Sequence, residues 1–211
     1  MSAREGVVLG QAGGRYRVFS RGELLSASLR GRMKQGQEER VLVGDRVALV
    51  IQEDGSATIE RIERRASLLR RRTPGRRHGV RAIVANVDQV IVVGAVRDPE
   101  WDPYLMDRFL AVSEANQLPV ALVINKCDLQ REYESLATPY HAGGYQVIHT
   151  SARTGMGLDE LRRRLQGRAS VFTGPTGVGK SSLLNALQPG LSLRTAEVSR
   201  KSRAGDRKSV V

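Results

Sequence analysis

Hydrophobic and polar residues alternate along the first sixty positions of the chain, and turn residues such as Asp54-Gly55 interrupt the alternation. A period of two is typical of a β-strand with one buried face. The expected strands are 6–9, 15–19, 24–29, 46–51 and 57–62. Five short strands predict a small closed barrel of the OB type over residues 1–64, although an SH3-like barrel or a purely structural β module fits the same pattern.

From Asp88 onward the pattern changes to strands that alternate with helices. Apolar runs predict buried strands at 90–93 and 119–124, a third strand is expected at 145–150, and 169–173 is expected to be a short buried strand. Helical periodicity follows Asp102-Pro103, a cap followed by proline, and appears again after Gly157 and after Ser181. This alternation predicts an α/β domain over residues 82–211, with a mainly parallel sheet and flanking helices.

One segment between an expected strand and an expected helix has the form G-x-x-x-x-G-K-S. Its residues, with the serine that follows, are Gly174, Pro175, Thr176, Gly177, Val178, Gly179, Lys180, Ser181 and Ser182. Glycines allow the loop backbone to close around phosphate oxygens, and the N-terminus of the helix adds a partial positive charge. Lys180 can reach the β- and γ-phosphates, and the Ser181 hydroxyl can bind Mg²⁺. We predict a nucleotide phosphate site here, with Ser181 as the metal ligand.

A second motif, Asn125-Lys126-Cys127-Asp128, follows the expected strand 119–124. Ligands of open α/β sheets bind at the carboxyl ends of the strands. An ionised Asp128 carboxylate only accepts hydrogen bonds, so it can take two from N1–H and the N2 amino group of guanine, a pair that adenine lacks. We expect Asn125 to brace the loop, Lys126 to cover the base, and Cys127 to be a small buried residue.

The guanine and phosphate motifs come in an unusual order. Ser151-Ala152 follows the expected strand 145–150, and its backbone N–H can meet guanine O6, although this dipeptide is a weak signal by itself. Both guanine elements precede the phosphate loop, whereas the loop comes first in ordinary small G proteins. We interpret the order as a circular permutation, which a fold tolerates when the original termini lie close together.

Basic residues outnumber acidic ones by 34 to 22, and the net charge is +12. Such an excess favours a polyanionic partner, nucleic acid first and an acidic membrane surface second. Nine arginines lie at positions 61, 64, 65, 70, 71, 72, 76, 77 and 81. We interpret 65–81 as an Arg-rich linker that contacts nucleic-acid phosphates, although an ordinary solvated linker has the same composition.

Cysteine content and hydropathy restrict the cellular context. The single cysteine, Cys127, excludes an internal disulfide and any multi-cysteine zinc site in this chain. No apolar run is long enough to span a bilayer, and the N-terminus lacks the pattern of a signal peptide. A cytoplasmic protein is the expectation.

The barrel, the segment Ala85-Asn86-Val87-Asp88-Gln89 and the permuted motifs together resemble the small ribosomal subunit biogenesis GTPase A (RsgA) family, up to about residue 205. The resemblance implies an OB-like barrel followed by a circularly permuted P-loop GTPase domain. It also implies hydrolysis of GTP to GDP with Mg²⁺, binding to 16S rRNA of the 30S ribosomal subunit during late maturation, and a cytoplasmic monomer. The matched positions, Asn125–Asp128 and Gly174–Ser182, would contact GTP.

The chain departs from the family pattern after about residue 205. Switch I, a D-x-x-G element and Cys/His zinc ligands follow there in the family, and this chain contains no D-x-x-G. We therefore expect a C-terminally truncated chain whose strand 169–173 is an open apolar edge, whose GTP hydrolysis is weak or absent, and which lacks the family's zinc ligands. No catalytic residue is assigned. The alternatives are an RNA-binding module with a vestigial nucleotide site, and a P-loop ATPase or kinase, which Asn125 and Asp128 disfavour.

Overall fold

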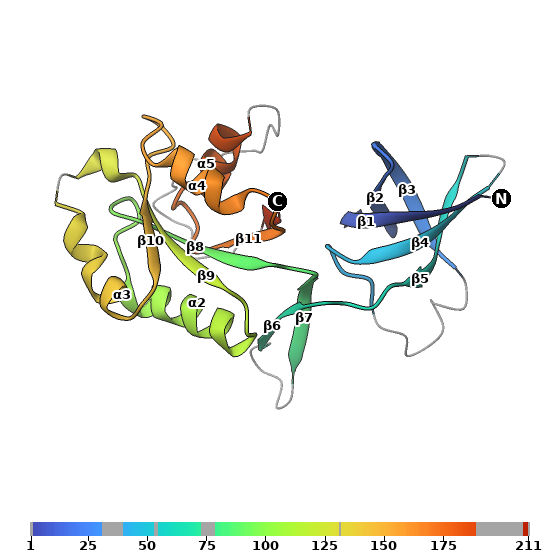
Figure 1. The fold of residues 1–211 in the computed structure, drawn as a ribbon, viewed down its shortest axis with the longest axis horizontal. Helices are drawn as coiled ribbons and strands as arrows, with labels where there is room; N and C mark the ends of the chain where they lie inside the picture. Colours follow the sequence, from blue (N-terminus) through green and yellow to red (C-terminus); the bar gives the residue numbers. More distant parts are fainter. Residues whose placement is uncertain are drawn as a thin grey trace. The chain divides into compact units, whose positions relative to one another are not determined.

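The structure is a computed structural model that describes residues 2–30, 40–52, 55–72, 79–130, 132–188 and 209–210. The chain forms two compact units, Met1–Val87 and Asp88–Val211, each with its own core (Figure 1). No helix within the described ranges is both long and apolar enough to cross a membrane.

Five strands of the first unit close into a barrel in the order β1-β2-β3-β5-β4. They are β1 (Ser2–Ala12), β2 (Arg15–Ser20), β3 (Glu23–Leu29), β4 (Arg46–Ile51) and β5 (Ala57–Ile62). Neighbours pair antiparallel except β3 and β5, which are parallel. Alternate residues such as Val18 and Leu49 are fully buried inside the barrel. The predicted barrel is confirmed because its period-two pattern places one face of each strand in this core.

After the barrel, strands β6 (Leu68–Arg72) and β7 (Val80–Ala85) form an antiparallel hairpin in the same unit. The sequence predicts a linker over 65–81, whereas the structure shows paired strands at both ends of that segment. Leu69 and Val84 face each other in the hairpin and are both buried. Few positions of the hairpin are buried, and arginines occupy many of its exposed positions. The alternation of apolar and polar residues is therefore weak in this part of the sequence. The arginines at 76 and 77 lie outside the described residues.

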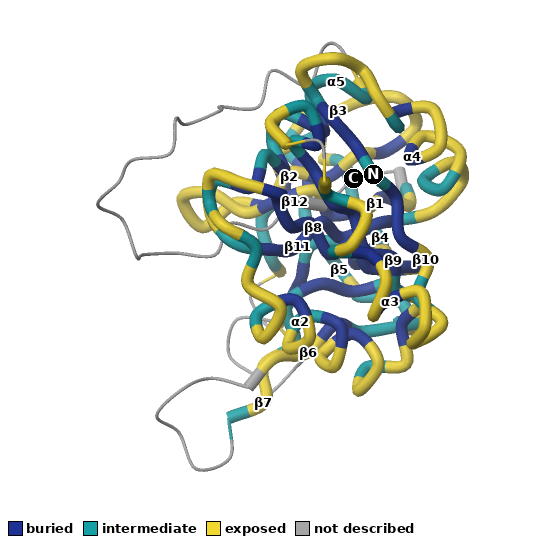
Figure 2. The backbone as a smooth tube through the Cα atoms, turned by 90° about the vertical axis from the view of Figure 1, so that its left-hand side faces the viewer, coloured by how far each residue is buried: buried dark blue, intermediate teal, exposed yellow. Residues whose placement is uncertain are grey.

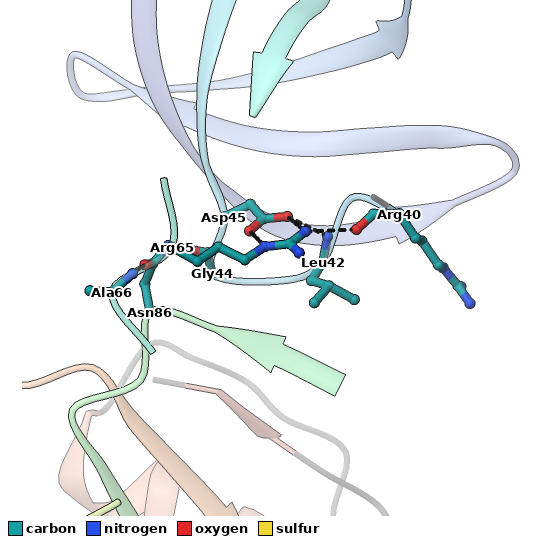
Figure 3. Close-up of polar contacts among 7 residues, drawn as sticks. All are labelled: Arg40, Leu42, Gly44, Asp45, Arg65, Ala66 and Asn86. Atoms are coloured by element: carbon teal, nitrogen blue, oxygen red, sulfur yellow. Dashed lines mark hydrogen bonds and ion pairs between the residues drawn. The ribbon is translucent and has the colours of Figure 1, made fainter. Parts of the chain in front are cut away.

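A buried ion pair joins the barrel to the chain that enters the hairpin (Figure 3). The Asp45 side chain is fully buried and accepts hydrogen bonds from Arg65 Nε at 2.7 Å and Arg65 Nη2 at 2.9 Å. Leu42 N–H donates a third bond to the same carboxylate, and Arg65 Nη2 also donates to the Arg40 carbonyl. Further hydrogen bonds help a buried charge pair to be tolerated, and here Leu42 N–H and the Arg40 carbonyl each supply one.

Asn86 makes a second link between the barrel and the hairpin (Figure 3). Its side-chain oxygen accepts from Ala66 N–H, and its amide nitrogen donates to the Gly44 carbonyl, both at 2.8 Å. The backbone of Asn86 is left-handed, with φ of 53°, a conformation that asparagine tolerates better than most residues. Barrel and hairpin are therefore fixed to one another by polar contacts as well as by apolar packing.

The second unit is an α/β sheet in the strand order β10-β9-β8-β11-β12. Its strands are β8 (Gln89–Ala95), β9 (Val120–Asn125), β10 (Gln146–His149), β11 (Ser170–Thr173) and β12 (Ser209–Val210). Its α-helices are α2 (Pro103–Ala115), α3 (Thr138–Ala142), α4 (Leu158–Leu165) and α5 (Lys180–Leu187). Strands β8 to β11 pair in parallel, which confirms the predicted parallel sheet.

Helices cover both faces of this sheet. In Figure 1, α2 lies along one face, and α4 and α5 lie on the other. Every residue of β8 is buried, and Figure 2 shows the central strands in dark blue. Helix α2 begins as expected, because the Asp102 carboxylate accepts the Leu105 N–H at 3.1 Å and Pro103 occupies the first turn.

Strand β11 is not the open edge that the sequence predicts. Val171 pairs with Val210 and Phe172 with Ser209 in an antiparallel ladder with β12. All four residues of β11 are buried, so their backbone groups need partners that water cannot supply. The two residues of β12 provide such partners, and the expectation of an unpaired edge is wrong.

Candidate nucleotide-binding site

The predicted phosphate loop connects the end of β11 to the start of α5. At Gly174, φ is 144°, and a Cβ atom there would lie 2.1 Å from the Val93 carbonyl oxygen of β8. Only glycine permits so close an approach to the neighbouring strand. Val178 is buried, whereas Thr176 at the middle of the loop is exposed. The loop is thus held against the carboxyl end of the sheet, with its middle open to solvent.

Lys180 begins α5, and its side chain turns back into the loop. Its ammonium donates to the carbonyls of Gly174 at 2.8 Å and Pro175 at 2.7 Å, and the residue is only 7% exposed. Ser181 and Ser182 follow in the first turn of the helix and are half-buried. A positive charge and the first amide groups of a helix therefore meet here, the arrangement that favours a bound anion.

Asn125, the last residue of β9, joins the two motifs directly. The residue is 1% exposed, and its Nδ2 donates to the Val178 carbonyl of the phosphate loop at 2.8 Å. Its Oδ1 accepts from Thr150 Oγ1 at the end of β10 at 3.1 Å. Gly179 has φ of 94°, and a Cβ there would lie 2.4 Å from Asn125 Nδ2. Motifs about fifty positions apart in the sequence are therefore in contact.

Lys126 lies beside this contact in a left-handed backbone conformation, with φ of 63°. Its ammonium donates to the Asp98 carbonyl after β8. Its Cε lies 3.9 Å from the position of a Cβ on Gly179, so the side chain runs past the phosphate loop. Burial lowers the pKa of Lys126, and the nearby Asp98 and Asp128 carboxylates offset part of that effect.

The Asp128 carboxylate meets the loop that follows β10. Its Oδ1 accepts from Ser151 Oγ, and its Oδ2 accepts from Arg153 Nε at 2.8 Å. Burial alone would raise the pKa of Asp128, but the hydrogen bonds from Ser151 and Arg153 outweigh it, and the pKa lies below its usual value. The carboxylate is therefore ionised at neutral pH and acts only as an acceptor.

Cys127 and Ala152 contribute to the packing beneath these side chains. Cys127 is buried; its N–H donates to the Thr150 carbonyl, and its thiol lies 3.2 Å from the Ile124 carbonyl. Burial raises the pKa of this thiol to about 11. Ala152 is half-buried and packs against the core between the sheet and helices α4 and α5. Both residues have small side chains, which fit the limited space at the ends of the strands.

A family model described as RsgA GTPase matches residues 62–209, more than half of the chain. The chain belongs to the RsgA GTPase family. A Gemmatimonas aurantiaca protein called small ribosomal subunit biogenesis GTPase RsgA is 48% identical over 92% of this chain and 66% of its own length. A Thermotoga maritima protein of the same name is 43% identical over 87% of this chain and 60% of its own length.

Solved structures of similar proteins have the same fold. YjeQ from Thermotoga maritima aligns with a TM-score of 0.75 and 40% identity, over 92% of this chain and 68% of that one. YloQ, described as a circularly permuted GTPase, aligns with a TM-score of 0.68 and 30% identity, over 89% of this chain and 65% of that one. The chain spans about 60–66% of the length of the curated RsgA relatives named above.

The RsgA fold brings most of the predicted residues to one edge of the sheet and adds three that sequence reasoning missed. Thr150 fixes Asn125, Arg153 binds Asp128, and Asp98 receives the Lys126 ammonium through its carbonyl. Thr150 and Arg153 flank Ser151-Ala152 in the sequence, so their position next to this motif could have indicated that they belong to the site. Asp98 follows β8, and nothing in the local sequence indicates its contact with Lys126.

Proposed function

We propose that this chain binds GDP and GTP at the carboxyl ends of β9, β10 and β11. The observation that carries the proposal is the hydrogen bond from Asn125 to the Val178 carbonyl, because it holds the base motif and the phosphate loop together. Asp128 would accept N1–H and N2–H of guanine, Lys126 would cover the base, and Lys180 would bind the β- and γ-phosphates. Ser151 and Ala152 would complete the base site.

Mg²⁺ fits the donors that this chain offers. Within the described residues no group of three His, Cys, Asp or Glu side chains could hold a metal ion. Mg²⁺ bound with a nucleotide does not need one, because phosphate oxygens and water supply most of its ligands. The Ser181 hydroxyl, in the first turn of α5, would supply the protein's ligand. The ion would neutralise negative charge on the phosphates.

We further propose that the whole protein hydrolyses GTP and acts in late maturation of the 30S ribosomal subunit, as a cytoplasmic monomer that binds 16S rRNA. The name of the curated relatives, small ribosomal subunit biogenesis GTPase, supports this role. Charge supports the rRNA part, because residues 1–87 contain 18 Lys and Arg against 9 Asp and Glu, a net +9 of the total +12. The zinc implied by the family resemblance stays a prediction.

Titration with fluorescent GDP, challenged with GTP or ATP, tests the nucleotide site. We expect saturable binding that GTP displaces and ATP does not. Asp128→Ala should abolish this preference, since no acceptor for the guanine edge remains. Asp159→Ala is the matched control, because this aspartate is exposed on α4 and its removal should leave GDP affinity unchanged. Displacement by ATP at the same concentration as GTP would contradict the proposal.

A second candidate, an RNA-binding module whose nucleotide site is vestigial, is favoured by the hairpin. Arg71 and Arg81 are exposed and occupy directly opposite positions on β6 and β7. Guanidinium groups at neighbouring exposed positions suit contact with nucleic-acid phosphates. Binding of the chain to 30S subunits should weaken steeply with salt, and Arg71→Ala with Arg81→Ala should reduce the slope by about two. RNA binding without saturable GDP binding would favour this second candidate.

A further inference from the structure

The Asp128 carboxylate has hydrogen-bond partners of two different kinds. Its Oδ1 accepts from the Ser151 hydroxyl, and its Oδ2 accepts from Arg153 Nε at 2.8 Å. Ser151 is fully buried, whereas the Arg153 side chain is 72% exposed. A buried hydroxyl would lose its hydrogen bond without compensation if it left, whereas a largely exposed guanidinium exchanges its partner for water at little cost. Arg153 is therefore the partner that can leave Asp128.

The loop that follows β10 keeps its shape without this ion pair. Ser151 N–H donates to the Met156 carbonyl at 3.0 Å, and Gly155 N–H donates to the Ser151 carbonyl at 2.9 Å. Thr154 N–H donates to Ser151 Oγ at 3.2 Å. These bonds close the loop on itself, and an exposed ion pair adds little to stability. A role in ligand binding therefore explains the ion pair better than a role in folding does.

The arginine side chain offers Asp128 the same kind of donor as guanine does. A guanidinium is planar and presents N–H groups side by side, which suits a carboxylate. The N1–H and N2 amino groups of guanine are joined through one carbon, so this edge of the base is itself a guanidine fragment. With its Nε on Asp128 Oδ2, the Arg153 guanidinium lies where a donor of the base must come. The two therefore compete for one carboxylate.

We propose that Arg153 is a latch on the guanine site: it occupies Asp128 before a nucleotide binds and gives way to the base, while Ser151 holds the carboxylate throughout. Arg153 acts through Asp128, so it is a positioning residue rather than a catalytic one. Because the latch must open before the base can pair, its cost falls on the association step. The inference rests on the proposed binding of GDP and GTP and names a residue that sets how fast they enter.

Lys126, another charged group near Asp128, has a different partner. Its ammonium donates to the Asp98 backbone carbonyl and not to the carboxylate that would pair with guanine. An ammonium also lacks the planar arrangement of donors that a guanidinium shares with the base. Lys126 therefore does not compete with guanine for Asp128, and in the part of the chain that the structure describes this competition comes from Arg153.

The test measures association and dissociation rates of fluorescent GDP with the 211-residue chain by stopped flow at neutral pH. Arg153→Ala should associate about twofold to fivefold faster and dissociate at an unchanged rate, since an exposed ion pair is weak and acts only before binding. The gain should shrink as salt rises from about 50 mM to about 500 mM. Arg153→Lys should return the association rate toward that of the unmodified chain. Arg163→Ala, which removes an exposed arginine of α4, is the matched control for the lost charge and should change neither rate.

Acidification gives a second readout of the opposite sign. Burial raises the pKa of Asp128, and the hydrogen bonds from Ser151 and Arg153 lower it. Without Arg153 this pKa lies higher, so Arg153→Ala should lose GDP binding at a higher pH than the unmodified chain does as the pH falls. Faster binding at neutral pH together with earlier loss in acid identifies a residue that competes for the carboxylate and also keeps it ionised. A purely structural residue would weaken binding at every pH.

The outcomes separate failure of the latch from failure of the nucleotide site. Equal association rates and equal pH profiles for Arg153→Ala and the unmodified chain would overturn the latch and leave the nucleotide site standing. Slower association or faster dissociation of Arg153→Ala at neutral pH would mean that Arg153 contacts the nucleotide, which also overturns the inference. If the unmodified chain and Arg153→Ala both fail to bind GDP, the proposed nucleotide binding fails and the latch with it.

Discussion

Replacing Gly179 with alanine tests whether the base motif and the phosphate loop form one site. Two costs add. A non-glycine residue in the left-handed region costs about 1–2 kcal/mol. The new Cβ would lie 2.4 Å from Asn125 Nδ2, so the amide must move and lose its buried hydrogen bond to Val178. Leaving a buried donor unsatisfied costs about 1–3 kcal/mol, and the expected total is about 2–5 kcal/mol.

Gly144→Ala is the matched control. Gly144 has φ of 80°, and no atom lies within 4 Å of the position of its Cβ, so only the backbone cost of about 1–2 kcal/mol applies. Urea unfolding of the two variants should therefore differ by about 1–3 kcal/mol. In GDP titrations, Gly179→Ala should lose at least about tenfold in affinity because Asn125 no longer holds the loop, whereas Gly144→Ala should bind normally.

Equal unfolding free energies for the two alanine variants, with equal GDP affinities, would refute this reasoning. That result would mean that Asn125 can move aside without loss and that its contact with Val178 carries no coupling between the motifs. A difference in unfolding free energy without a difference in GDP affinity would support the close packing of Gly179 against Asn125. It would contradict the claim that this contact contributes to GDP binding.

Three further predictions concern buried or partnered side chains. Asp45→Asn should destabilise the first unit by about 3–5 kcal/mol in thermal or urea unfolding, because Arg65 is left as an uncompensated buried charge. The pKa of Asp128 is lowered, so its contribution to GDP binding should be constant through neutral and mildly acidic pH and be lost only as the pH falls through that lowered pKa. Arg153→Ala raises this pKa, so titrations across pH should show the loss at higher pH. Cys127, with a thiol pKa of about 11, should react slowly with iodoacetamide at pH 8 and rapidly in urea.

Most strands could be predicted from the sequence because their hydrophobic periods match their burial. The barrel strands and the parallel strands β8 to β11 are of this kind. The hairpin β6–β7 could not, since arginines occupy its exposed positions and, among its described side chains, only Leu69, Val84 and Ala85 are buried. The two-residue β12 is too short to have a period. The boundaries 1–64, 65–81 and 82–211 stay a prediction.

The local geometry of the candidate site was predictable where a motif fixes the backbone, as at Gly174 and Lys180, whereas the ligands of these residues stay a prediction. Contacts between motifs were not, because the bond from Asn125 to Val178 depends on the order of the strands rather than on neighbouring residues. Alternation also does not say which face of a strand is buried. Phe19 is an aromatic residue in a strand, yet its parity places it outward with the arginines.

A crystal structure of the chain with GDP and Mg²⁺ tests the central claim most directly. The account predicts one nucleotide per chain, with N1–H and N2–H of guanine donating to the Asp128 carboxylate and the β-phosphate bound by the Lys180 ammonium. It also predicts that, when the base binds, Arg153 no longer donates to at least one of the Asp128 carboxylate oxygens, so that this oxygen can accept from guanine. A nucleotide bound at one of these residues but not at the other, or in a different place altogether, would contradict it.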